Sequence, residues 1–143
     1  MKKENNKSVE KFKKECVRNN LRVTPQRTVI YKKVVSSKEH PSAEEVYDDV
    51  LNTMPNISFD TVYRTLTTFS EIGIVEKVEG TGDKRRFDPN TDNHHHFRCL
   101  KCDTIIDFSY DDFKELTVPQ KVKNYFDITR KRVVLEGLCS KCK

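Results

Sequence analysis

The sequence predicts an α+β protein in two parts, and three observations indicate it. Three successive segments with helical periodicity lead into two short strand-like runs around a glycine-rich turn. A polar, turn-rich segment, Pro89–Asn93, follows them. Two Cys-x-x-Cys pairs lie in the remaining segment, among further strand patterns. We therefore expect a front domain over residues 1–88, a hinge over 89–93 and a back domain over 94–143.

The composition is that of a polar, mildly basic globular chain. Its 143 residues include 27 basic and 22 acidic side chains, for a net charge of +5, which permits a polyanionic partner without demonstrating one. Residues 1–14 are charged throughout and are expected to form a solvated first helix. No signal peptide or long apolar run is evident, so a cytoplasmic location without membrane contact is expected.

Helix start signals define the next two helices. Thr24-Pro25 combines a capping hydroxyl with a proline at the first helical position, and this helix is expected to end near Ser36-Ser37. The following helix begins at Ser42, where Glu45 completes a capping box.

A third helix is expected over Ser58–Ile72, with Gly73 as its left-handed cap. Its apolar face has helical spacing: Phe59, Val62, Leu66, Phe69 and Ile72. Strands over Ile74–Val78 and Arg85–Asp88 flank a turn at Gly80–Asp83. Three helices and a hairpin are the order of a winged helix-turn-helix domain, in which the third helix is the recognition helix. A generic three-helix packing unit is the alternative.

The back domain contains three strand candidates and one interrupted helix. The strands are expected at His96–Cys99, Thr104–Phe108 and Asp127–Glu136. The helix is expected around Asp111–Tyr125, with Pro119 interrupting it.

Four cysteines predict a structural zinc site. Each Cys-x-x-Cys pair lets two sulfurs face one ion, and two pairs complete a closed tetrahedral shell: Cys99, Cys102, Cys139 and Cys142. Two local disulfides or a redox pair are the alternatives, and a reducing compartment disfavours the first. Cys16 is interpreted as a half-buried bystander on a helix.

A histidine cluster indicates a second metal site. His94 and His96 share a face of an extended segment, whereas His95 points away. Together with carboxylates they suit iron(II), manganese(II) or zinc(II). An accidental polar triplet is an equal alternative on spacing alone. The further candidate ligands are His40, Asp88 and Asp107.

A metalloenzyme is the alternative from another functional class. Zinc deaminases require His-x-Glu and Pro-Cys-x-x-Cys, but Arg98 precedes Cys99 and no such glutamate follows the histidines. Other catalytic motifs are absent from the sequence, so catalysis is disfavoured.

Taken together, these residues resemble the ferric uptake regulator (Fur) family of bacterial repressors. The resemblance extends from about residue 11 to residue 142. It rests on Leu21–Arg27, His40–Tyr47, Thr61–Leu66, Gly73–Val75, Arg86–Asp88 and the His94-x-His96-Phe97-x-Cys99-x-x-Cys102 pattern.

The resemblance implies a homodimer that binds a double-stranded DNA operator, with a winged helix in front and an α/β dimerisation domain behind. It also implies a structural Zn2+ at the four cysteines and a regulatory Fe2+ or Mn2+ at the hinge. The regulatory ligands would be His40, Asp88, His94, His96 and Asp107. An ion bound by residues of both domains would fix the angle between them and favour a DNA-competent state.

The resemblance also implies DNA contacts on the recognition helix. Tyr63 and Arg64 match base-contacting positions, with Arg64 suited to guanine and Tyr63 to a thymine methyl. Thr61 and Arg22 are further candidates.

The aspartates distinguish branches of the family. Asp88 and Asp107 resemble the peroxide-sensing branch, in which iron and hydrogen peroxide oxidise the histidines matching His40 and His94. Iron regulators usually carry glutamates there, and lysines at 114 and 131 argue against their third metal site. Because Tyr63-Arg64 is closer to iron regulators, an iron- or zinc-responsive regulator of metal uptake is the alternative.

Overall fold

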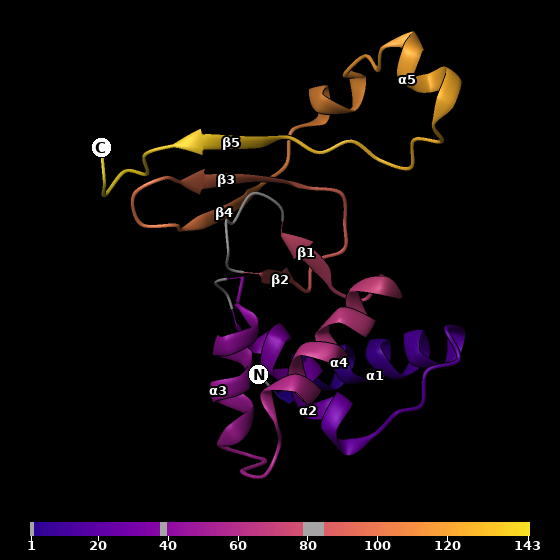
Figure 1. Ribbon diagram of the computed structural model, residues 1–143, viewed down its shortest axis with the longest axis vertical. Helices are drawn as coiled ribbons and strands as arrows, with labels where there is room; N and C mark the ends of the chain where they lie inside the picture. The colour runs from indigo at the N-terminus through magenta and orange to yellow at the C-terminus, as the bar shows by residue number, and fades with distance from the viewer. Residues whose placement is uncertain (1, 38–39, 79–84) are drawn as a thin grey trace. The chain divides into compact units, whose positions relative to one another are not determined.

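The computed structural model describes residues 2–37, 40–78 and 85–143, which form two compact units. The units are Met1–Thr91 and Asp92–Lys143, so the division falls inside the turn-rich segment Pro89–Asn93. Helices dominate the first unit, whereas a three-stranded sheet dominates the second (Figure 1). The mixed helix and sheet content confirms the predicted α+β class.

Over its described residues, the first unit contains four helices: α1 (Lys2–Arg18), α2 (Pro25–Ser36), α3 (Ala43–Leu51) and α4 (Phe59–Glu71). Side-chain caps begin the last three of them. Thr24 Oγ1 accepts a hydrogen bond from an amide in the first turn of α2 at 3.2 Å. Ser42 and Glu45 form the predicted capping box: Ser42 Oγ accepts a hydrogen bond from the Glu45 amide at 3.2 Å, and Glu45 Oε2 accepts one from the Ser42 amide at 2.9 Å.

The predicted recognition helix is α4. Ser58 caps it by accepting a hydrogen bond from an amide of its first turn at 3.1 Å. Gly73 follows it at φ +82°, a backbone conformation that favours glycine, as the sequence predicted. A hairpin comes next: β1 (Glu76–Val78) pairs antiparallel with β2 (Arg86–Asp88). The predicted turn at Gly80–Asp83 lies outside the described residues.

An aromatic cluster joins α1, α2 and α4 in the core of this unit. Phe12 stacks on Tyr31 with ring centres 4.7 Å apart, and Phe69 meets Phe12 edge-on at 5.5 Å. Cys16, one turn after Phe12, is 0% exposed, so the expectation of a half-buried bystander is wrong. Positions four apart share a helix face, and α1 packs this face on α2. Burial raises the pKa of the Cys16 thiol.

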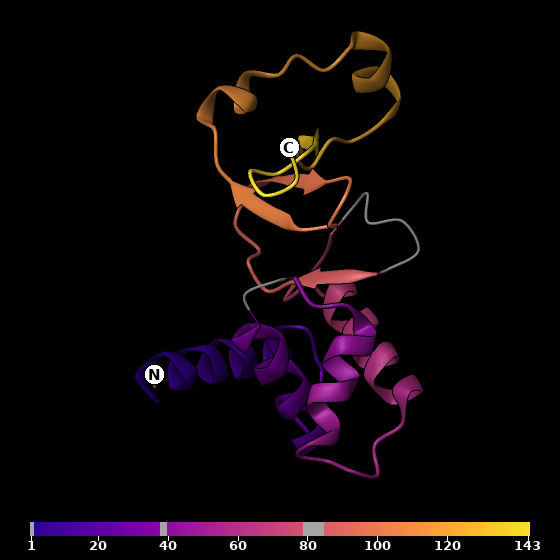
Figure 2. The ribbon, with the colours of Figure 1, turned by 90° about the vertical axis from the view of Figure 1, so that its left-hand side faces the viewer.

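The second unit is built on a sheet with strand order β4-β3-β5. The central strand β3 (His95–Cys99) pairs antiparallel with β4 (Ile105–Phe108) and parallel with β5 (Val134–Gly137). A short 3₁₀ helix, Asp111–Glu115, and α5 (Gln120–Tyr125) lie between β4 and β5. Both views show this connection extending away from the sheet (Figures 1 and 2).

The structure modifies two predictions for this unit. The helix predicted around Asp111–Tyr125 is interrupted as expected: the 3₁₀ helix ends at Glu115, and Pro119 immediately precedes α5. The strand predicted over Asp127–Glu136 is mostly wrong. Only its end pairs in the sheet: Val134–Gly137 match His96–Cys99 of β3, and the Val133 carbonyl accepts a hydrogen bond from the His96 amide at 3.2 Å.

The apolar core of the second unit is small. Among its described hydrophobic residues, only Cys99 and Ile105 are buried. Larger apolar side chains remain exposed, including Tyr125, Phe126 and Leu135 at 81%, 65% and 47%. A unit with so little buried apolar surface needs a further source of stability. Within the described residues, no helix has the length and apolar character needed to cross a membrane.

Candidate functional site

The four cysteines of the second unit converge on one point. Their sulfurs lie within 4.8 Å of one another, although residues 103–138 separate the two pairs. The sheet explains this convergence. Cys99 at the end of β3 is the register partner of Gly137 at the end of β5, and the amide of Leu100 donates to the Gly137 carbonyl at 2.8 Å. The parallel pairing of β3 and β5 therefore brings both Cys-x-x-Cys turns to the same end of the sheet.

The sulfur spacing fits a tetrahedral zinc ion. Cys102 Sγ and Cys139 Sγ are 3.8 Å apart, far beyond a disulfide bond. Sulfurs about 2.3 Å from a central zinc, at tetrahedral angles, lie about 3.8 Å apart. All five cysteines are free thiols, so the disulfide alternative is not supported.

Hydrogen bonds favour ionisation at one side of this cluster. Backbone amides of Cys102 and Cys139 lower the pKa of the Cys99 thiol to about 6. The Thr104 hydroxyl, 3.1 Å from the sulfur, is the largest cause of the lowered pKa of Cys102. By contrast, hydrogen bonding to Cys139 is the largest cause that raises the pKa of Cys142, to about 12. Four thiols this close cannot all ionise without a cation, and a dication removes that conflict.

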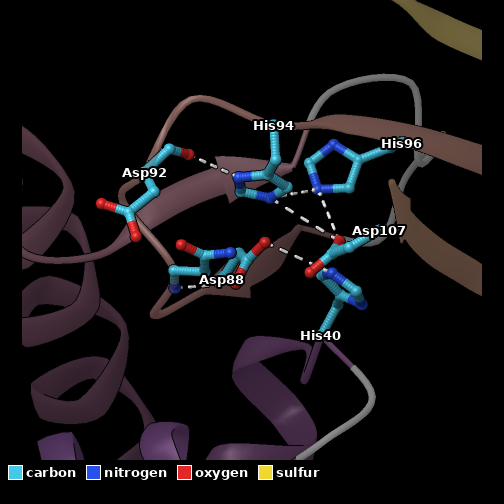
Figure 3. A network of polar contacts seen from close by, with 7 residues as sticks. His40, Asp88, Asp92, His94, His96 and Asp107 are labelled. Carbon is cyan, nitrogen blue, oxygen red and sulfur yellow. Dashed lines mark hydrogen bonds and ion pairs between the residues drawn. The ribbon is translucent and has the colours of Figure 1, made fainter. Parts of the chain in front are cut away.

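A second cluster in this unit consists of two imidazoles and a carboxylate. The Nε2 atoms of His94 and His96 are 3.1 Å apart, and Asp107 Oδ1 lies 3.1 Å from His96 Nε2 and 3.6 Å from His94 Nε2 (Figure 3). Nitrogens about 2.1 Å from one ion and at right angles lie about 3.0 Å apart. These donors therefore have the spacing of ligands that share an ion.

Neighbouring elements hold these donors in place. His96 on β3 and Asp107 on β4 are register partners across the antiparallel pair. His94 Nδ1 is 2.6 Å from the Asp92 carbonyl oxygen, which can only accept, so Nδ1 carries the proton. In the neutral ring, this tautomer leaves the Nε2 lone pair for a ligand.

His95 has a different role from its neighbours. Its ring packs against Phe108 and Phe113, with centres 5.7 and 5.0 Å away, and its Nδ1 accepts a hydrogen bond from the Val133 amide at 3.0 Å. Burial is the largest cause of its lowered pKa. The prediction that it points away from the other two histidines is confirmed.

The first unit contains a His–Asp pair. His40 Nε2 lies 3.3 Å from Asp88 Oδ2, and both side chains are buried (Figure 3). The segment after His40 holds it there, since the Pro41 carbonyl accepts a hydrogen bond from the Phe87 amide at 3.0 Å. The backbone of His40 has φ +46°, an unfavourable region for a residue other than glycine. Strained residues of this kind gather at functional sites.

The exposed face of α4 carries the predicted DNA-contacting side chains. Arg64 is 79% exposed, and its Nε lies 2.9 Å from Asp60 Oδ2. The guanidinium carbon of Arg85 lies 5.4 Å from the centre of the half-buried Tyr63 ring. Thr61 takes part in the helix cap, because its hydroxyl is 2.9 Å from that of Ser58.

The remaining DNA candidate is Arg22, in the segment before α2. Its backbone carbonyl accepts a hydrogen bond from the Arg27 guanidinium at 2.7 Å. Sequence reasoning missed both Asp60 and Arg85 as neighbours of the predicted contacts. The spacing of Asp60 and Arg64, four residues apart on a helix, was a usable signal. No sequence signal indicated the contact between Arg85 and Tyr63, because it depends on the pairing of β2 with β1, which brings Arg85 close to α4.

Comparison with known proteins gives consistent results. The sequence model of the ferric uptake regulator family matches residues 18–136. The chain is 40% identical over 123 residues to the peroxide-responsive repressor PerR of Staphylococcus epidermidis, covering 86% of this chain and 82% of that protein. It is 38% identical over 122 residues to the PerR of a Staphylococcus aureus strain, covering 85% and 82%.

Solved structures with a similar fold come from the same group of proteins. The Vibrio cholerae ferric uptake regulator has a TM-score of 0.64 at 31% identity, covering 87% of this chain and 96% of that one. PerR from Streptococcus pyogenes has a TM-score of 0.54 at 27% identity, covering 95% and 93%. The Helicobacter pylori ferric uptake regulator, at 21% identity and a TM-score of 0.75 over 96% and 93%, supports the fold alone.

Proposed function

Because the chain belongs to the ferric uptake regulator family, we propose that it is a metal-dependent, DNA-binding transcriptional repressor that senses hydrogen peroxide. This is a family of regulators and not of enzymes. The curated relatives at 38–40% identity are peroxide-responsive repressors, which supports the finer assignment. The observation that carries the proposal is the convergence of the buried His94 and His96 with Asp107.

The first unit supplies the DNA-binding surface. Helix α4 would lie in the major groove, where Arg64 has the geometry to read guanine and Tyr63 to contact a thymine methyl. Thr61 and Arg22 would add contacts to the backbone of a double-stranded operator. The exposure of Arg64, at 79%, supports this assignment.

The regulatory ion would be held by both units. The pair of His40 and Asp88 offers two donors, and the cluster of His94, His96 and Asp107 offers three. Iron(II) and manganese(II) take more ligands than either set provides, so we propose that the two sets share one ion. Five shared ligands would fix the angle between the domains at residues 1–88 and 94–143. The segment 89–93 would then act as the hinge.

Sensing would follow from the choice of ion. An iron(II) ion held by these residues would activate hydrogen peroxide by reversible one-electron transfer, and the two electrons that reduce the peroxide would come from an imidazole ligand. Manganese(II) would support DNA binding without this reaction. In the net reaction, His40 or His94 gains one oxygen atom from hydrogen peroxide and water leaves. An oxidised imidazole is a poorer ligand, so the ion is lost and the repressor leaves its operator. The burial of both rings, 7% and 5% exposed, restricts this oxidation to small molecules such as peroxide.

Zinc and a second subunit would stabilise the back domain. The closed four-cysteine shell of Cys99, Cys102, Cys139 and Cys142 leaves no position for a signal molecule, so its zinc would be structural. The exposed apolar side chains of this unit fit a homodimer interface, because a monomer would leave them in water.

A gel-shift experiment with one operator duplex tests the sensing step. We expect iron-loaded and manganese-loaded protein to bind equally before treatment. Dilute hydrogen peroxide should release only the iron-loaded protein. Mass spectrometry should then find one added oxygen on peptides that carry His40 or His94. Manganese-loaded protein treated in parallel is the control.

Retention of DNA by the iron-loaded protein, without added oxygen, would contradict peroxide sensing. That outcome would favour an iron- or zinc-responsive regulator of metal uptake. The 31% identity with the Vibrio cholerae ferric uptake regulator supports this second candidate.

A further inference from the structure

Arg64 is bound to a neighbour on its own helix. Its Nε lies 2.9 Å from Asp60 Oδ2, one helical turn earlier, and the two side chains are 79% and 67% exposed. A pair this exposed adds little to folding stability, because water screens the charges. Asp60 also lies in the first turn of α4, where a negative charge interacts favourably with the helix dipole and stabilises the helix slightly. These small effects are the structural roles against which a functional role must be tested.

The atoms that meet suggest more than a stabilising pair. A guanidinium has five N–H donors in a fixed plane, and a carboxylate on Nε restricts the orientations of that plane. The two terminal nitrogens of Arg64 are then available to donate hydrogen bonds to O6 and N7 of guanine. An arginine oriented before binding loses less side-chain entropy on contact with the base.

The carboxylate also acts on the DNA backbone. Phosphates are attracted to the amino-terminal end of a helix, which is where Asp60 lies. A negative charge at this end repels phosphates and weakens binding to DNA of any sequence. Arg64, in contrast, is attracted to any phosphate unless its charge is balanced nearby. Asp60 therefore opposes non-specific contacts by both routes.

We propose that Asp60 determines sequence specificity at the DNA interface, by orienting Arg64 toward guanine and by opposing phosphate contacts at this end of α4. The inference rests on the proposed DNA-binding function and adds a positioning residue to it. Asp60 need not touch DNA itself. Replacing it should therefore change the base preference of DNA binding more than the folding stability of the protein.

The test uses the full chain loaded with zinc and manganese(II). Wild-type protein first selects operators from a random-sequence duplex library, and Arg64→Ala identifies the base pair that Arg64 reads. Asp60→Asn is then compared with wild type at that pair. We expect it to lose about fivefold of its guanine preference there. Affinity for a random duplex should rise about two- to threefold, because a repelling charge is gone.

Three variants make this result specific. Asp48→Asn removes another exposed carboxylate, from α3, and should leave the base preference unchanged. Asp60→Glu keeps a carboxylate within reach of Arg64 and should restore the preference. In an Arg64→Ala background, Asp60→Asn should have no further effect on the preference, because the arginine through which it acts is absent.

Each contrary outcome has a distinct meaning. If Asp60→Asn changes only the melting temperature, Asp60 is a helix-stabilising residue and the inference is wrong. A cytosine preference that depends on Asp60 in the Arg64→Ala background would mean that Asp60 reads a base itself, which also overturns it. If wild-type protein selects no sequence in the presence of manganese(II), the proposed function fails and the inference with it.

Discussion

Arg85 covers one face of Tyr63: its guanidinium carbon lies 5.4 Å from the centre of the ring. Phe59, one helical turn before Tyr63, is an aromatic neighbour of the same ring, with ring centres 6.1 Å apart and planes tilted by 30°. The contact joins the residue before strand β2 to the proposed recognition helix. It therefore restricts the orientations of a side chain that is proposed to meet DNA.

Replacing Arg85 with alanine is expected to weaken operator binding by about three- to tenfold. An exposed cation–π contact contributes about 0.5–1 kcal/mol, and a cation near DNA is lost as well. Fluorescence anisotropy with manganese-loaded protein measures the change. Arg18→Ala removes another exposed cation, from α1, and serves as the control. Equal losses in the two variants would mean that only net charge matters.

Local signals predicted the first unit well, because contacts between residues close in sequence determine where its helices begin and end. The Ser42–Glu45 capping box and the left-handed Gly73 involve contacts within a few residues. Cys16 was misjudged for the opposite reason. Its burial depends on the packing of α1 against α2, which the helix pattern alone does not reveal.

Long-range pairing limited the predictions for the second unit. The zinc ligands were identifiable because each Cys-x-x-Cys turn is local, but the parallel β3–β5 pairing that joins them was not. The strand expected from Asp127 was too long because its length is set by partner strand β3 and not by its own residues. The alternation of His94, His95 and His96 followed from strand geometry alone.

Loss of one zinc ligand is expected to unfold the second unit. Cys139→Ser should reduce bound zinc from one ion per chain to none, because three sulfurs hold zinc much more weakly and few apolar residues are buried there. Metal analysis after gel filtration and circular dichroism measure the two effects. Dissociation of the homodimer should accompany them.

Cys16→Ser is the matched control for that experiment. It should keep its zinc but lower the stability of the first unit by about 1–3 kcal/mol, because a hydroxyl replaces a thiol at a fully buried position. Zinc loss from this variant, or zinc retention by Cys139→Ser, would contradict the assignment of the four-cysteine site.

His40→Asn should separate regulation from folding. Asparagine tolerates the left-handed backbone at φ +46° but offers no imidazole, so metal-dependent operator binding should be abolished. Zinc content and the dimer should remain intact, because we propose that both depend on the other unit. His40→Ala should show the same loss of binding with lower thermal stability, since alanine suits this backbone poorly.

The readouts are anisotropy with manganese(II), zinc analysis and a melting curve. If His40→Asn retains metal-dependent binding to the operator, the proposal that both units share one ion is wrong. Similar behaviour of the His40 and Cys139 variants would mean that the two metal sites do not have separate roles.

Thr104→Val tests whether a hydroxyl tunes the zinc site. The Thr104 hydroxyl lies 3.1 Å from Cys102 Sγ and is the largest cause of the lowered pKa of that thiol. Valine has nearly the same shape and leaves the backbone hydrogen bond between the Cys99 amide and the Thr104 carbonyl, at 2.9 Å, in place. Zinc affinity should fall about tenfold, as for other lost hydrogen bonds to metal ligands.

The same substitution should change the pH at which zinc is released. Without the hydroxyl, the pKa of Cys102 returns toward its usual value, so protons compete with zinc at higher pH and release begins earlier on acidification. Equilibrium competition with a chromophoric chelator across a pH series measures both quantities. Thr117→Val, at an exposed position of the same unit, is the control. An unchanged release midpoint in Thr104→Val would show that the hydroxyl does not stabilise the thiolate.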